Sequence, residues 1–133
     1  KSERIEFRIL ELLKKYKINK YFFLDSSFPM IYLLSNQNEH NIALRFSEFE
    51  GMDTILNMKG KINWVWVDCF TRLPIDKKDF ELLNNSGFRI CLVSPDLVGR
   101  AEDIDKYKDV MCEQRILFDA VCTKIHNINK WIL

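Results

Sequence analysis

Two observations predict a parallel α/β fold built from five βα units. Short apolar runs recur at intervals of about 20 to 30 residues, which is the spacing of βα units rather than of hairpins. The runs are almost entirely apolar and do not alternate, as expected for strands buried on both faces of a parallel sheet. The predicted strands are YFFLD at 21–25, NIALRF at 41–46, WVWVD at 64–68, FRICLVS at 88–94 and FDAVCTK at 118–124.

The segments between these runs predict the helices. Their apolar residues recur at helical intervals, with charged residues on the other side. Pro29 can begin one of them, because proline is tolerated in the first turn of a helix. Linkers and internal repeats are absent, so residues 1–133 are predicted to form a single domain. The predicted helices span 5–16, 30–34, 76–85 and 101–111, and a last helix begins at 128.

Composition and charge exclude several classes of function. Lysine and arginine together number 20 against 19 acidic residues, so the net charge gives no attraction to nucleic acid or to an anionic membrane. No apolar run reaches the roughly 18 residues of a membrane-spanning helix, and the first residues lack a signal-peptide core. The cysteines form no CxxC pair, and three lie in apolar runs, which is typical of reduced thiols. We therefore expect a cytoplasmic protein with neither a nucleic-acid partner nor a membrane span.

Polar residues gather where the predicted strands end. In parallel α/β folds the ligand site lies beyond the carboxyl ends of the strands, because the βα loops meet there. Carboxylates together with arginine and lysine suit a phosphorylated or hydroxylated small molecule, with or without a divalent cation. The predicted substrate contacts are Asp25, Arg45, Glu48, Asp68 and Lys124.

Structural roles compete with binding at several of these positions. Arg45 lies in an apolar strand and needs a partner, and either Asp25 or Glu48 would serve in an ion pair. His40 falls in a polar loop on the opposite rim, and His126 follows the last strand without an identified partner. No GxSxG, Walker A, GxGxxG or zinc-ligand spacing occurs. No catalytic residue is therefore predicted.

Five short motifs together resemble a known family. In order they are YFFLDSSFPM, ALRFSEFE, WVWVDCF, ICLVSPDLVGR and DAVCTK, covering roughly residues 21–124. The succession is similar to the later strands of phosphatidylinositol-phospholipase C-like and glycerophosphodiester phosphodiesterase-like TIM barrels. The resemblance implies the C-terminal five strands of an eight-stranded barrel. It also implies a phosphodiester ligand, whose phosphate Arg45 and Lys124 would hold while Asp68 orients substrate hydroxyls or assists a divalent cation, Mg²⁺ or Ca²⁺.

The sequence departs from that family in its catalytic parts. The family's His-Arg pair and Glu-x-Asp segment, which supply acid–base groups and metal ligands, have no match. We therefore expect this chain to be inactive in hydrolysis by itself. Five strands cannot close a barrel, so its edges are expected to pair with a missing N-terminal segment or with a second copy in a homodimer. The alternative prediction is an open, flavodoxin-like doubly wound sheet that binds a partner protein or regulatory ligand without catalysis.

Overall fold

The structure is a computed structural model and describes residues 5–132. It contains one five-stranded sheet in which every neighbouring pair of strands is parallel. The predicted βα repeats are therefore confirmed, with strands shorter than the apolar runs. The strands are β1 (Phe23–Leu24), β2 (Ile42–Phe46), β3 (Trp64–Val67), β4 (Arg89–Val93) and β5 (Ala120–Cys122).

The first helix precedes the first strand and the other α-helices lie between strands; four match predicted helices, whereas the third, α3 (Met52–Asn57), was not predicted. Ser27 caps the second helix by accepting a hydrogen bond from the Met30 N–H, and Asp76 caps the fourth. The helix expected from residue 128 is a 3₁₀ segment instead, η3 (Ile125–Trp131), and Leu133 lies outside the described residues. The α-helices are α1 (Ile5–Lys15), α2 (Phe28–Ser35), α3 (Met52–Asn57), α4 (Lys77–Asn85) and α5 (Ile104–Gln114), with 3₁₀ segments η1 (Pro95–Val98) and η2 (Ala101–Asp103) before α5.

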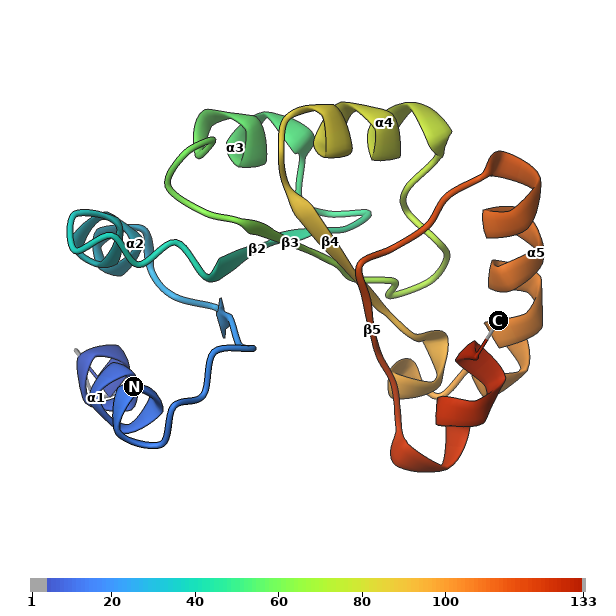
Figure 1. The fold of residues 1–133 in the computed structure, drawn as a ribbon. Helices are drawn as coiled ribbons and strands as arrows, with labels where there is room; N and C mark the ends of the chain where they lie inside the picture. Colours follow the sequence, from blue (N-terminus) through green and yellow to red (C-terminus); the bar gives the residue numbers. More distant parts are fainter. Residues whose placement is uncertain (1–4, 133) are drawn as a thin grey trace.

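The order of the strands decides between the two predicted architectures. Along the sheet the order is β1-β2-β3-β4-β5, the same as in the chain. In a doubly wound sheet the strands stay parallel, but the order in which successive strands are added to the sheet reverses after the first ones, and helices cover both faces. Here the sheet curls and α1 to α5 follow one another in an arc along its outer side (Figure 1). The flavodoxin-like alternative is therefore wrong, and the sheet resembles part of a barrel wall.

The main hydrophobic core lies between the sheet and the helices. Alternate residues of each strand point to this side, so the central strands contribute Val65 and Val67 of β3 and Ile90 and Leu92 of β4, all at most 1% exposed. Helix residues such as Leu83 of α4 pack against them. Burial of this apolar surface is the main stabilising term for the fold. No helix within residues 5–132 is long and apolar enough to cross a membrane.

The concave face of the sheet is apolar but only partly covered. Ala43, Trp64 and Cys91 are buried there, and the rings of Phe22 and Trp64 lie 4.9 Å apart. Around them lie side chains that stay partly exposed: Phe22, Leu24, Trp66, Ala120 and Cys122. The strands were expected to be buried on both faces. They are more completely buried on the face that carries the helices, and only partly buried on the concave face.

Candidate polar site at the carboxyl ends of the strands

The guanidinium of Arg45 joins three successive βα units at the carboxyl ends of their strands. Its Nη2 donates to Asp25 Oδ1 at 2.9 Å, its Nη1 donates to Asp68 Oδ2 at 3.0 Å, and its Nε lies 3.8 Å from Glu50 Oε1. The register explains this meeting, because Arg45 is paired with Trp66 of β3, and Asp68 follows two residues later, directly after the end of that strand. We call these four residues the Arg45 cluster.

The Arg45 cluster brings three carboxylates to one guanidinium. Of these, Asp68 is only 7% exposed while the Asp25 side chain is 53% exposed. A buried carboxylate is costly without a cation, so Arg45 is the group that allows Asp68 to remain charged. Asp25 also adopts a left-handed backbone conformation, with φ of 59°, which asparagine and aspartate tolerate better than most residues. The cluster therefore offers carboxylate oxygens, which accept hydrogen bonds, more readily than a free cation.

A pocket of about 490 Å³ opens beside this cluster, which is within the range of small-molecule sites. Asp25, Arg45 and Glu50 line it together with the rings of Phe28 and Phe49. Phe49 is 76% exposed and its ring lies 5.7 Å from that of Phe70. The pocket thus combines acidic groups with an aromatic border.

Glu48, another predicted contact, is held by the neighbouring loop. Its carboxylate accepts hydrogen bonds from the Thr71 N–H at 2.7 Å, the Thr71 hydroxyl at 2.9 Å and the Arg72 N–H at 2.9 Å, with a longer one from Phe70. Burial alone would raise the pKa of the Glu48 carboxyl, but the hydrogen bonds from Thr71 and Arg72 lower it to about 2. Glu48 therefore fixes the β3–α4 loop. Of the two partners expected for Arg45, the structure shows an ion pair with Asp25 and none with Glu48.

At the other side of the rim, Lys124 lies next to a buried carboxylate that the predicted contacts omit. Asp96 of η1 is 1% exposed, and it accepts hydrogen bonds from the Thr123 hydroxyl, the Lys124 N–H at 3.1 Å and Asn127 Nδ2 at 2.7 Å. Burial alone would raise the pKa of Asp96, but these hydrogen bonds and one from Ser94 lower it to about 2. Asp96 thereby ties the β4 and β5 exits together. The ammonium of Lys124 forms no ion pair within residues 5–132.

The described residues do not fit the divalent cation that the family resemblance implies. Nowhere in residues 5–132 do three or more histidine, cysteine, aspartate or glutamate side chains gather as a metal site would require. The carboxylates of Asp25, Glu50 and Asp68 lie around the Arg45 guanidinium, a cation that already neutralises part of their charge. No chemical step through a metal follows from the described residues.

Comparison of the chain with protein families, with curated proteins and with solved structures gave no match.

We predict that the Arg45–Asp68 pair contributes much more to stability than the Arg45–Asp25 pair. Arg45→Met leaves Asp68 charged and nearly buried without its cation, which should lower the free energy of unfolding by about 2–4 kcal/mol. Asp25→Asn, at the exposed side of the cluster, should cost less than about 1 kcal/mol. Urea unfolding at neutral pH measures both, and Arg45→Met/Asp68→Leu should recover part of the loss. Equal effects of Arg45→Met and Asp25→Asn would contradict this assignment.

The low pKa of Glu48 predicts a dependence of stability on pH. The carboxyl ionises near 4.5 when exposed and at about 2 in the folded chain, so its stabilisation is complete above about pH 4.5 and is lost as the pH falls towards 2. Urea unfolding at a series of pH values should therefore give a shallower dependence for Glu48→Gln than for the parent chain over this window. The control is Glu113→Gln, an exposed residue of α5, which should keep the parent slope. The same slope for Glu48→Gln and the parent would sink the assignment.

Proposed function

We propose that the chain forms five of the eight βα units of a phosphodiesterase-like barrel, and that its rim binds a glycerophosphodiester or a related phosphorylated polyol. The observation that carries this proposal is the Arg45 cluster, which gathers polar groups from three successive parallel strands at the edge where such folds bind ligands. The sequential strand order and the curl of the sheet support the barrel (Figure 1).

The groups of the cluster favour one end of such a ligand. The carboxylates of Asp25 and Glu50 line the pocket beside Arg45, and carboxylate oxygens are suited to accept hydrogen bonds from glycerol hydroxyls. A phosphate next to them would be repelled. Lys124, at the exit of β5 on the other side of the rim, does not line this pocket, so the phosphate of a ligand bound here would point towards solvent while Arg45 orients the carboxylates.

Hydrolysis is assigned to groups outside the described residues. His40 Nδ1 lies 3.2 Å from the Lys61 carbonyl oxygen at the amino-terminal side of β2, and His126 is exposed in η3. Neither histidine has a described contact with the Arg45 cluster, as a general acid or base for a ligand bound there would need. The proposed function of this chain is therefore binding and orientation.

The concave face supports completion of the barrel by three further βα units. Each edge strand pairs on one side only, β1 with β2 and β5 with β4. Unpaired edges beside an uncovered apolar face favour pairing with further strands. Three more strands give the eight of a closed barrel, whereas a second copy of this chain would give ten, so we prefer the former to a homodimer.

The cysteines support a cytoplasmic location for this barrel. All four are free thiols, with Cys69 and Cys91 buried, Cys122 half-buried and Cys112 exposed. Free thiols of this kind are typical of a reducing compartment.

We predict that glycerophosphocholine binds at the Arg45 cluster. In ¹H–¹⁵N NMR titrations of the chain, the amides of residues 24–26, 45–50 and 68–70 should shift in a saturable way. Asp25→Asn should weaken binding by about three- to tenfold, because one charge-assisted hydrogen bond is lost. The matched control is Asp109→Asn on the exposed side of α5, which should bind as the parent does.

Two further measurements separate binding from chemistry. Inorganic phosphate should shift the cluster amides less than glycerophosphocholine does, and the reverse order would contradict the assignment of Asp25 to the hydroxyls. The chain should release no choline in the presence of Mg²⁺ or Ca²⁺. Turnover by this chain would overturn the proposal that its role is binding alone.

A further inference from the structure

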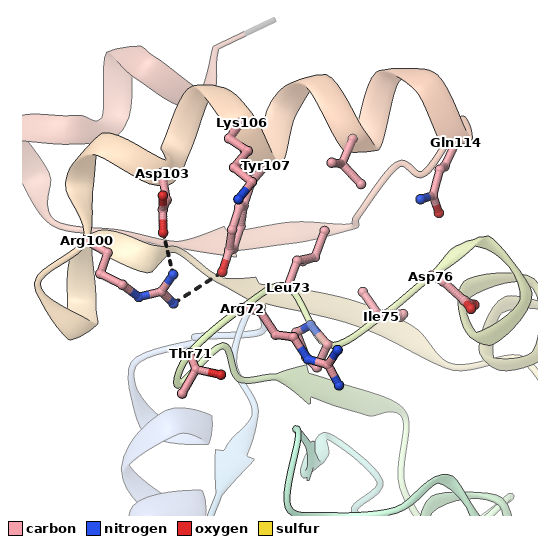
Figure 2. A pocket seen from close by; sticks show the side chains of 12 residues that line it. Thr71, Arg72, Leu73, Ile75, Asp76, Arg100, Asp103, Lys106, Tyr107 and Gln114 are labelled. Atoms are coloured by element: carbon pink, nitrogen blue, oxygen red, sulfur yellow. Dashed lines mark hydrogen bonds and ion pairs between the residues drawn. The ribbon is translucent and has the colours of Figure 1, made fainter.

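A second pocket, separate from the Arg45 cluster, lies between the β3–α4 loop and α5. Its volume is about 440 Å³, within the range of small-molecule sites. One wall is the loop of residues 71–76, and the other is the face of α5 that carries Lys106, Tyr107, Val110 and Gln114. These helix positions recur at intervals of three and four residues, so they share one side of α5. Figure 2 shows this arrangement, with the α5 side chains facing the loop.

Hydrogen bonds hold the two walls of this pocket in place. Arg100 pairs with Asp103 and donates from Nη2 to the Cys69 carbonyl at 2.8 Å and to the Tyr107 hydroxyl at 3.2 Å. It thereby links the end of β3 to the first turns of α5. On the loop, Glu48 accepts from the Arg72 N–H at 2.9 Å. The backbone that carries Arg72 is therefore fixed before any ligand arrives, which lowers the entropic cost of binding.

The charges that line the pocket leave two cations without a partner. Arg100 pairs with Asp103, whereas the Asp76 carboxylate, which accepts the Asp79 N–H as the cap of α4, keeps its negative charge. Arg72 and Lys106 form no ion pair within residues 5–132. They stand on opposite walls of the same pocket, one on the loop and one on α5 (Figure 2). Together Arg72 and Lys106 outweigh the single charge of Asp76, and this surplus of positive charge in the lining favours an anionic ligand.

The remaining lining is apolar and limits the kind of anion. Leu73, Pro74 and Ile75 of the loop and Val110 of α5 contribute hydrocarbon surface beside the two cations. A small inorganic ion would leave this surface in water, whereas an organic anion would cover it. We propose that the pocket binds a small organic anion, a phosphate or carboxylate, with its charged group between Arg72 and Lys106 and its apolar part on this surface. The proposal does not depend on the function proposed for the Arg45 cluster.

Three probes test the pocket in the 133-residue chain: phenyl phosphate, benzoate and inorganic phosphate. In ¹H–¹⁵N NMR titrations, phenyl phosphate or benzoate should give saturable shifts at the amides of residues 71–76 and 103–114. Either should bind more tightly than inorganic phosphate, because the ring covers the apolar lining. Tighter binding of phenyl phosphate assigns the pocket to organic phosphates, and tighter binding of benzoate assigns it to carboxylates.

Charge variants decide whether Arg72 and Lys106 are responsible. Arg72→Gln and Lys106→Gln should each raise the dissociation constant by about tenfold, as expected for the loss of one charge-assisted contact. The control is Lys59→Gln/Lys61→Gln, which removes two exposed lysines. They precede β3, at the amino-terminal end of the strands, whereas the pocket lies at the carboxyl end, so binding should be unchanged. Asp25→Asn should also bind as the parent does, which separates this pocket from the Arg45 cluster. The proposal is overturned if neither organic probe saturates at these amides, or if Arg72→Gln/Lys106→Gln binds as tightly as the parent.

Discussion

The ion pair between Arg45 and the nearly buried Asp68 is the interaction on which the rim of this sheet depends. Side chains on the concave face of β2 and β3 point away from the main core, so a carboxylate there must be neutralised where it emerges. Arg45 does this and also reaches Asp25 and Glu50, which fixes the exits of β1, β2 and β3 relative to one another. The positioning of these loops and the proposed binding of a ligand therefore depend on the same guanidinium.

Two other carboxylates organise the remaining exits in a different way. Glu48 and Asp96 accept several backbone and side-chain hydrogen bonds instead of pairing with a cation. Such bonds stabilise the charged form of a carboxyl group even where burial opposes it. One of them fixes the β3–α4 loop beside the second pocket, and the other fixes the turn after β5. Carboxylates thus organise the strand exits in two ways, and of those around Arg45, Asp25 and Glu50 also line a pocket.

The sequence predicted the parallel βα repeats, but not the order of the strands in the sheet, helix α3 or the roles of the rim residues. The five apolar runs and their spacing predicted the parallel strands. Asp25 was one of the two partners expected for Arg45, and the two residues form an ion pair. Spacing alone could not show that Glu48 turns to the loop at Thr71, because that contact joins residues 23 apart across two strand exits. Asp96 follows an apolar strand just as Asp68 does, so the sequence did carry a signal that could have marked Asp96 as a rim residue. Its partner Asn127 depends on a 3₁₀ segment that no periodicity predicted.

The central claim is that the Arg45 cluster holds the hydroxyl end of a phosphorylated polyol. A crystal structure of the chain with glycerophosphocholine tests it most directly, because it locates the ligand without reference to activity. The account predicts the ligand in the pocket lined by Asp25, Arg45 and Glu50, with a glycerol hydroxyl hydrogen-bonded to a cluster carboxylate. A ligand bound instead at the amino-terminal ends of the strands, beside Trp64 and Arg89, would contradict it.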